Sequence, residues 1–116
     1  MGRVVGFELS SQEPEKAVEF YSDVFGWKAA EPQWDYWAVV TGENHLAGIN
    51  GGIGKGPSDF PQGSRIQIEV DSIDHTIKIA TDKGAMIVRD KMEFADFYLA
   101  YLVDPVGNGI GLIEKK

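Results

Sequence analysis

The sequence contains no cysteine, and this absence removes several kinds of chemistry at once. Disulfide bonds, zinc sites built on thiolates and cysteine nucleophiles are all excluded. Long apolar runs are also missing, because none approaches the ~20 residues of a membrane span and the first ten residues lack the apolar core of a signal peptide. We therefore expect a soluble, cytoplasmic protein that does not bind membranes.

Positive charge is scarce as well. The chain has 11 Lys and Arg residues against 18 Asp and Glu residues, which gives a net charge of −7. Such a charge repels nucleic acid phosphates, and the basic residues are scattered without forming a patch. We therefore expect no nucleic acid partner. With 43% hydrophobic and 25% charged residues, the 116 residues are typical of one globular domain.

The first half of the chain has the pattern of a strand, a helix and three more strands. Residues 3–9 form a short apolar run that predicts a strand. A helix is predicted to begin at Pro14, since proline at the first helical position lacks only an amide that would be unpaired anyway. Gly26 is predicted to end it, because glycine readily adopts the left-handed conformation of a helix C-terminus. Three short strands are predicted at residues 27–30, 36–41 and 46–53.

The second half of the chain repeats this order. Residues 65–70 predict a strand, and Asp71 and Ser72 can cap a helix that ends at Gly84. Three more strands are predicted at residues 85–89, 97–103 and 109–114. The helix-ending glycines are separated by half the length of the chain, which indicates an internal repeat.

The repeat predicts the fold class. We expect an α+β fold of two βαβββ modules within a single domain, residues 1–116. Module one is residues 1–53, module two is residues 64–116, and a linker rich in Gly and Pro joins them over residues 54–63. Neither module could cover its own sheet, so we expect the sheets to pair around a shared concave space.

Several motifs resemble those of a known family. The run Val4–Glu8, followed by Glu13–Ala17 and Phe20–Trp27, resembles the first module of glyoxalase/bleomycin-resistance proteins, the vicinal oxygen chelate superfamily. Residues 104–108 followed by Ile110–Leu112 resemble the closing motif of that family. The resemblance spans nearly the whole chain and implies the glyoxalase/bleomycin-resistance fold. It implies less about function, because this fold hosts metal-dependent lyases, isomerases and dioxygenases as well as metal-free binders.

The metal chemistry of the family depends on four positions. The resemblance implies one His, Gln or Glu ligand on the first and the last strand of each module, and it places these positions at Gly6, Gly48, Arg65 and Gly111. Glycine has no side chain to coordinate an ion, and the permanent charge of arginine opposes a divalent cation. We therefore expect no metal centre of the family type and no cofactor.

Polar side chains lie on the first strand of each module. Counting by two from Gly6 and Arg65 keeps to one face of each strand, so Glu8, Arg65, Gln67 and Glu69 are predicted to face the cleft that the resemblance implies. They could recognise a ligand, and Glu8 or Glu69 could do acid–base chemistry if desolvated. An internal Glu–Arg network is an equally good interpretation, because buried charges are normally paired.

Aromatic residues on the central strands are candidates for the wall of the cleft. Tyr36 and Trp37 face opposite ways by alternation, so one can line the cleft while the other packs under a helix, and we assign Trp37 to the cleft. Tyr101 is assigned to the cleft from the second module. An aromatic wall without a metal suits a flat or apolar organic ligand.

Three functions are compatible with these observations. The first is a glyoxalase/bleomycin-resistance-like protein that binds a small organic molecule in a cleft without the metal centre. Its ligand-binding residues are Glu8, Trp37, Arg65, Gln67, Glu69 and Tyr101. The second is a metal-dependent lyase or isomerase of the lactoylglutathione lyase (glyoxalase I) type, and the third is an interaction module without a pocket. We also expect a homodimer, because two short modules leave sheet edges and apolar strand faces that relatives cover by pairing.

Overall fold

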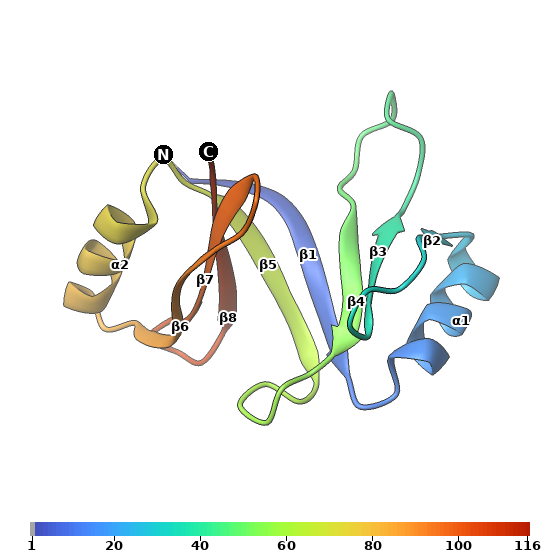
Figure 1. Ribbon diagram of the computed structural model, residues 1–116, viewed down its shortest axis with the longest axis horizontal. Helices are drawn as coiled ribbons and strands as arrows, with labels where there is room; N and C mark the ends of the chain where they lie inside the picture. The colour runs from blue at the N-terminus through green and yellow to red at the C-terminus, as the bar shows by residue number, and fades with distance from the viewer. Residues whose placement is uncertain (1) are drawn as a thin grey trace. The chain divides into compact units, whose positions relative to one another are not determined.

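The computed structural model describes residues 2–116, and these residues contain eight strands and two helices (Figure 1). The order is strand, helix and three strands, and it occurs twice along the chain. The chain divides into two compact units. The first unit is Gly6–Ser64, and the second is Arg65–Lys116 together with the described residues up to Val5. The predicted α+β fold of two βαβββ modules is confirmed.

The connection between the modules is shorter than the predicted linker of residues 54–63. Strand β4 (Gly51–Lys55) includes the first residues of the predicted linker, and strand β5 (Gly63–Glu69) includes its last residue. The connection between the two strands is therefore residues 56–62. The strand predicted over residues 46–53 is also displaced toward this connection. The reason is that glycine, which indicated a flexible linker in the sequence, also occurs inside β4. There it leaves room for side chains of neighbouring strands.

The first unit is a sheet with one helix against it. Its remaining elements are β1 (Arg3–Ser11), α1 (Pro14–Phe25), β2 (Lys28–Ala29) and β3 (Tyr36–Val40). The strands lie in the order β2-β3-β4-β1, with β1 parallel to β4 and the other neighbours antiparallel. As predicted, α1 begins at Pro14 and ends at Gly26, which has a φ of 73°.

Alternation along the strands places the buried hydrophobic residues of this sheet on one face. Three of its residues are buried hydrophobics: Trp37, Val39 and Ile53. Trp37 and Ile53 are in register on β3 and β4, so their side chains lie on the same face. Trp27 connects this face to the helix, because its ring centroid lies 5.4 Å from that of Phe7 on β1 and 4.7 Å from that of Tyr21 on α1. We infer that α1 covers the face of Trp37 and leaves the opposite face uncovered by the helix.

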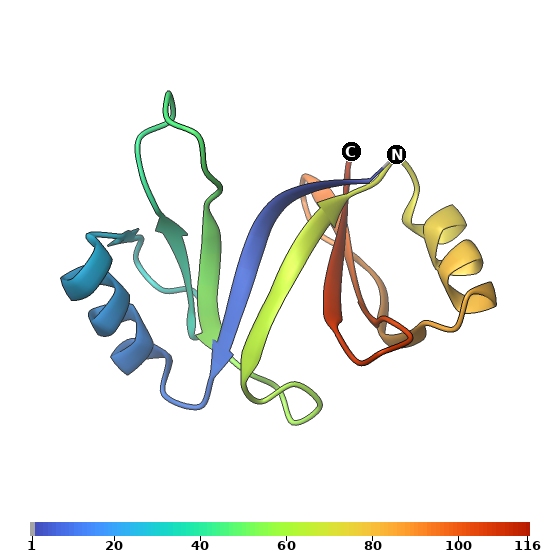
Figure 2. The ribbon, with the colours of Figure 1, turned by 180° about the vertical axis from the view of Figure 1, so that it is seen from behind.

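The second unit repeats this arrangement. Its remaining elements are α2 (Ile73–Asp82), β6 (Met86–Glu93), β7 (Phe97–Val103) and β8 (Gly109–Lys115), and α2 lies alongside the sheet (Figure 2). The strands lie in the order β5-β8-β7-β6, with β5 parallel to β8 and the other neighbours antiparallel. Within residues 2–116, neither helix is long and apolar enough to cross a membrane.

The core of the second unit lies between α2 and one face of its sheet. Four buried residues form it: Ile73, Ala100, Leu102 and Leu112. Strand β6 is longer than the predicted residues 85–89. Its register with β7 shifts on both sides of Arg89, and such irregularities interrupt the alternation by which a strand is predicted.

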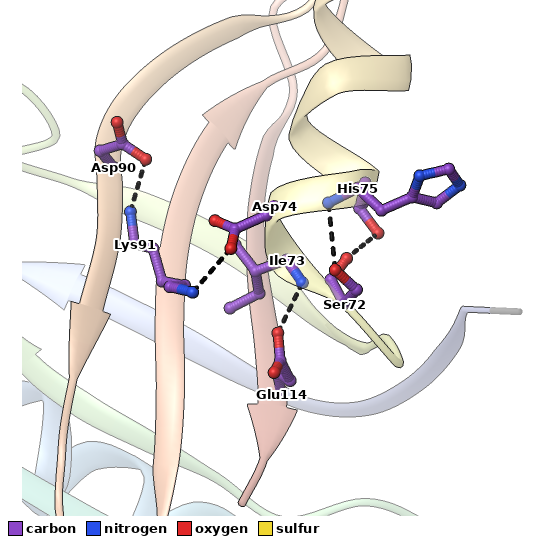
Figure 3. Close-up of polar contacts among 8 residues, drawn as sticks. Ser72, Ile73, Asp74, His75, Asp90, Lys91 and Glu114 are labelled. Atoms are coloured by element: carbon purple, nitrogen blue, oxygen red, sulfur yellow. Dashed lines mark hydrogen bonds and ion pairs between the residues drawn. The ribbon is translucent and has the colours of Figure 1, made fainter.

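Two side chains accept hydrogen bonds from two of the backbone N–H groups in the first turn of α2 (Figure 3). The predicted cap, Ser72, accepts a hydrogen bond from the His75 backbone N–H at 3.1 Å. The carboxylate of Glu114 on β8 accepts a second one from the Ile73 backbone N–H at 2.7 Å. The helix is therefore fixed at its start to the strand on which it packs.

Candidate functional site

One row of residues crosses the sheet of the second unit on the face opposite the core. Gln67 on β5 is in register with Gly111 on β8, and Gly111 is in register with Tyr101 on β7. Residues in register point to the same side of a sheet. Arg65 and Glu69 stand two positions before and after Gln67, so they share this face. The structure thus brings four predicted site residues together on one sheet face: Arg65, Gln67, Glu69 and Tyr101.

Arg65 is the buried charge of this face. Its side chain is only 7% exposed, and its guanidinium carbon lies 4.0 Å from the centroid of the Tyr101 ring. A guanidinium stacked on an aromatic ring is held in one orientation, and the attraction between them is strengthened by desolvation. Arg65 therefore presents its planar N–H groups in a fixed direction.

Gly111 makes this packing possible. A Cβ atom at this position would lie 3.3 Å from Cε1 of Tyr101 and 3.4 Å from Cγ of Gln67. The ring of Tyr101 and the side chain of Gln67 therefore pack over the backbone of β8 itself. A carboxylate at residue 111 would occupy the space that these two side chains now fill.

Glu69 lies in a different environment from Arg65. Its side chain is 35% exposed, and its Oε1 atom lies 3.5 Å from Nζ of Lys115, whose side chain is 72% exposed. An ion pair of this kind contributes little, because water screens it. Glu69 shares the sheet face with Arg65, but it sits at the solvent-exposed end of it.

The first unit has a corresponding polar face. Glu8 on β1 is in register with Gly52 on β4, and Gly52 is in register with Ala38 on β3. Tyr36 stands two positions before Ala38, so it lies on the same face as Glu8. Glu8 is 8% exposed, which makes it the buried carboxylate of this face.

Trp37 does not lie on this face, and the assignment of this residue to the binding wall is corrected here. Trp37 is buried with Ile53 on the face that we infer α1 covers. Alternation predicted that Tyr36 and Trp37 face opposite ways, but it did not show which of the two faces the helix. The register of β3 with β4 decides this and places Tyr36 beside Glu8.

Tyr36 is the residue of this face that sequence reasoning assigned elsewhere. A Cβ atom added at Gly52 would overlap its hydroxyl group, and one added at Gly54 would lie 3.0 Å from its Cδ2 atom. The ring therefore lies along β4 with its hydroxyl end over Gly52. Burial, and to a smaller extent the negative charge of Glu8, raises the pKa of Tyr36 to about 12.

The strand register corrects one of the four metal positions of the family. Glu8 pairs with Gly52 as Gln67 pairs with Gly111, so the position in the first module equivalent to Gly111 is Gly52. Gly48 precedes β4 and has a φ of 152°. The four glycines within residues 48–54 allowed this error, because they offer no side chains by which to fix the alignment.

The residues at these four positions do not fit the metal centre of the family. Three are the glycines Gly6, Gly52 and Gly111, and the fourth is Arg65, a buried cation. Within residues 2–116, no three His, Cys, Asp or Glu side chains are grouped so that they could hold a metal ion. A divalent ion needs several N or O donors around it, and these positions supply none.

Comparison with known proteins agrees with this architecture. The chain matches the family described as "Glyoxalase-like domain" over residues 6–113. It is 28% identical over 94 residues to a "Glyoxylase-like domain-containing protein" of Didymella fabae, an alignment that covers 77% of this chain and 73% of that protein.

Solved structures show the same fold at low identity. A glyoxalase/bleomycin resistance protein/dioxygenase superfamily member from Vibrio splendidus 12B01 is 16% identical, with a TM-score of 0.67 and full coverage of both chains. Methylmalonyl-CoA epimerase, in complex with methylmalonyl-CoA and NH4+, is 12% identical, with a TM-score of 0.67 over 99% of this chain and 95% of that one. At these identities the likeness concerns the fold alone.

Proposed function

Because the chain belongs to the glyoxalase-like domain family, we propose that it binds a small organic molecule on one of the polar sheet faces described above, without the metal centre of its superfamily. The observation that carries this proposal is the face of Arg65, Gln67 and Tyr101 on the second unit. This face combines the buried guanidinium of Arg65, the amide of Gln67 and the aromatic ring of Tyr101. These side chains lie around Gly111, which stands at a position where the superfamily has a metal ligand.

The chemistry of this face favours a flat ligand with a polar or anionic group. The guanidinium of Arg65 brings a positive charge to this face, and such a charge favours an oxygen-bearing group such as a carboxylate or a carbonyl. The amide of Gln67 can donate and accept hydrogen bonds, so it can fix the orientation of the ligand. Tyr101 adds apolar ring area beside these donors, and a mixture of apolar walls and few polar groups is typical of small-molecule sites.

The alternative is a metal-dependent lyase or isomerase of the lactoylglutathione lyase type. Several members of this superfamily are enzymes, and methylmalonyl-CoA epimerase shares the fold. Such an activity in this chain would need metal donors at positions where glycine and arginine stand. No observation in the two units favours it over binding.

The test measures metal content and binding on the same preparation. We expect elemental analysis of the dialysed protein to show no stoichiometric nickel, zinc, cobalt or manganese. A screen of small aromatic and carboxylic compounds by thermal shift is then run with a chelator present. Hits are expected to persist with the chelator and to weaken in Gln67→Leu, while the control variant Gln62→Leu, in the exposed connection, leaves them unchanged. Tight metal, or hits that vanish with the chelator, would support the lyase instead.

A further inference from the structure

A cavity of about 510 Å³ lies between α2 and the sheet of the second unit, on the sheet face opposite Arg65. Its walls come mainly from the helix on one side and from β5, β7 and β8 on the other. All the described residues that line it belong to the second unit. Small-molecule sites in proteins have volumes of about 300–1,000 Å³. The cavity is therefore large enough for a ligand, and it is separate from the polar face on which the proposed function depends.

The position of α2 leaves this space open. The helix packs mainly against β6, β7 and β8, whereas β5 lies at the other side of the sheet of this unit. Ile68 on β5 and Ile79 on α2 line the cavity from its two sides, and Ile79 is 49% exposed. Gly2 borders the cavity beside β5, because a Cβ atom there would lie 2.8 Å from Cγ2 of Ile68.

The first unit connects its helix to its first strand with aromatic rings. The ring of Phe7 on β1 lies 5.4 Å from that of Trp27, and the ring of Trp27 stacks on that of Tyr21 on α1 at 4.7 Å, between ring centroids. These three rings form a continuous bridge between the strand and the helix. The first unit thus occupies this part of its fold with its own side chains.

The second unit has no aromatic residues at the positions equivalent to Phe7 and Trp27. By the strand register described above, Phe7 corresponds to Ile66. Trp27 directly follows the glycine that ends α1, and the residue that follows Gly84 is Ala85. Both positions therefore have smaller, aliphatic side chains in the second unit.

The helix position equivalent to Tyr21 is also aliphatic. Counted from the glycines that follow the two helices, Tyr21 corresponds to Ile79, and counted from the first residue of each helix it corresponds to Ala80. Both Ile79 and Ala80 line the cavity. The second unit therefore lacks the bridge of rings and has an open space beside its helix, which favours an occupant that is not part of the unit.

The walls define the chemistry of this occupant. Of the twelve described residues that line the cavity, eight are aliphatic or Gly, and none is aromatic, Lys or Arg. An anionic group would be costly to bury there, because these walls offer no permanent cation to pair with it. The cavity therefore suits an uncharged ligand with an aliphatic body.

The polar residues of the cavity lie together around the start of α2. They are Asp71, Ser72, His75 and Thr76. Two of them stabilise the helix, since Ser72 accepts a hydrogen bond from the His75 backbone N–H and the Thr76 hydroxyl donates one to the Ser72 carbonyl at 2.7 Å. A hydroxyl and an imidazole can also exchange hydrogen bonds with a ligand. A polar group of the ligand therefore belongs at this end of the cavity.

We propose that this cavity is a second ligand-binding site, which takes an uncharged aliphatic or alicyclic molecule and holds a hydroxyl group of that molecule at the start of α2. The driving force is the transfer of apolar ligand surface from water to aliphatic walls. The inference does not rest on the proposed function, because the two sites lie on opposite faces of the same sheet.

The experiment uses cyclohexanol as the probe of the cavity and benzoate as a charged, aromatic comparison. Each compound is titrated into protein labelled at its isoleucine methyl groups, and the methyl signals are followed by NMR. We expect cyclohexanol to shift the signals of Ile68, Ile79 and Ile110, which line the cavity. The signal of Ile53, which is buried in the first unit, should not move. Benzoate is expected to leave the three cavity signals unchanged.

Three variants test whether the cavity itself is the site. Ile79→Phe places a ring beside the cavity and is expected to raise the dissociation constant of cyclohexanol about tenfold or more, because the ring takes the space of the ligand. Lys78→Phe adds the same ring at the neighbouring exposed position of α2, which does not line the cavity, and should leave this constant unchanged. Ile79→Ala widens the cavity, so this variant should still bind cyclohexanol.

Several outcomes would overturn the inference. They are equal binding by Ile79→Phe and the unmutated protein, the absence of shifts at the three isoleucines, and shifts of the same size with benzoate. A dimer that Ile79→Phe converts into a monomer would also overturn it, because a second copy of the chain would then cover this space. Thermal-shift hits that depend on Gln67 lie on the other sheet face, so the proposed function would survive each of these outcomes.

Discussion

The guanidinium carbon of Arg65 lies 4.0 Å from the centre of the Tyr101 ring, and this cation is buried. The same unit offers a comparison, because Nζ of Lys91 lies 4.8 Å from the centre of the Tyr98 ring and Lys91 is exposed. The attraction between a cation and a ring is larger when water does not compete for the cation. The two pairs therefore differ in desolvation, in the distance from the cation to the ring and in the kind of cation.

A double-mutant cycle of Arg65→Met and Tyr101→Leu measures the first of these contacts. We expect a coupling free energy of about 1–2 kcal/mol in urea unfolding, and about 0.5 kcal/mol for the matched cycle of Lys91→Met and Tyr98→Leu. Equal coupling in both cycles would contradict the stronger attraction that we expect between Arg65 and Tyr101. The ring of Tyr101 would then be a packing group only.

Removing the carboxylate that caps α2 is expected to destabilise the second unit. Glu114→Ala leaves the Ile73 backbone N–H without its partner at 2.7 Å, and the expected loss in the free energy of unfolding is about 1–2 kcal/mol. Glu114→Gln retains an acceptor oxygen, so it should cost less. Glu31→Ala, at an exposed position of the first unit, serves as the control in the same unfolding assay.

The raised pKa of Tyr36 predicts a loss of stability at alkaline pH. The pKa is raised from 10.0 to about 12 in the folded protein, so the folded state holds this proton more tightly than the unfolded chain does. The contribution is complete below pH 10 and is lost as the pH rises toward 12. Because the residue is partly exposed, we expect about 1 kcal/mol. The measurement is the free energy of unfolding of the unmutated protein and of Tyr36→Phe at several pH values in this range. The unmutated protein should lose stability relative to Tyr36→Phe as the pH rises.

The turn before β3 is strained, and relieving the strain is expected to stabilise the protein. Trp34 and Asp35 adopt positive φ angles of 51° and 58°, although neither is glycine. Asn and Gly are the residues preferred where a two-residue hairpin turn has positive φ at both central positions. Trp34→Asn combined with Asp35→Gly should therefore raise the free energy of unfolding by about 1–2 kcal/mol. A decrease would show that the positive φ angles of Trp34 and Asp35 do not destabilise the folded state.

We expect the protein to form a homodimer. Three apolar side chains of α1, Phe20, Val24 and Phe25, are 54%, 56% and 60% exposed, which is an unusual concentration for a surface helix. Light scattering at micromolar concentration should give twice the mass of one chain. Phe25→Lys should shift this value toward the monomer, and Val106→Lys, in an exposed turn, should not. A strictly monomeric unmutated protein would contradict the expectation.

Most of the fold was predictable because its signals are local. Pro14 and Gly26 delimit α1, and Ser72 caps α2, as the sequence indicated. The errors lie where glycine weakens a pattern or where a strand is irregular. Four of the five residues of β4 are Gly or Lys, so this strand has no alternation of apolar and polar residues. In β6, the register shifts on both sides of Arg89 interrupt that alternation.

The candidate site was predictable only where the alternation of side chains along a strand decides which face a residue occupies. Counting by two placed Arg65, Gln67 and Glu69 on one face, and the structure agrees. The choice between Tyr36 and Trp37 depended on which side α1 packs, and this is a property of tertiary structure. The equivalence of Gly52 with Gly111 depended on strand register, which a run of glycines does not specify.

Strand β1 is divided between the two units, and this has a consequence for how the chain folds. Its first residues, up to Val5, belong with the second unit, and those from Gly6 onward belong with the first. A Cβ atom at Gly2 would lie 2.8 Å from Cγ2 of Ile68, so the beginning of the chain packs against residues from beyond its midpoint. During synthesis these first residues emerge long before their partners do. We expect their docking to be a late, high-contact-order event, and truncation before Val5 to slow the folding of the half that is made last.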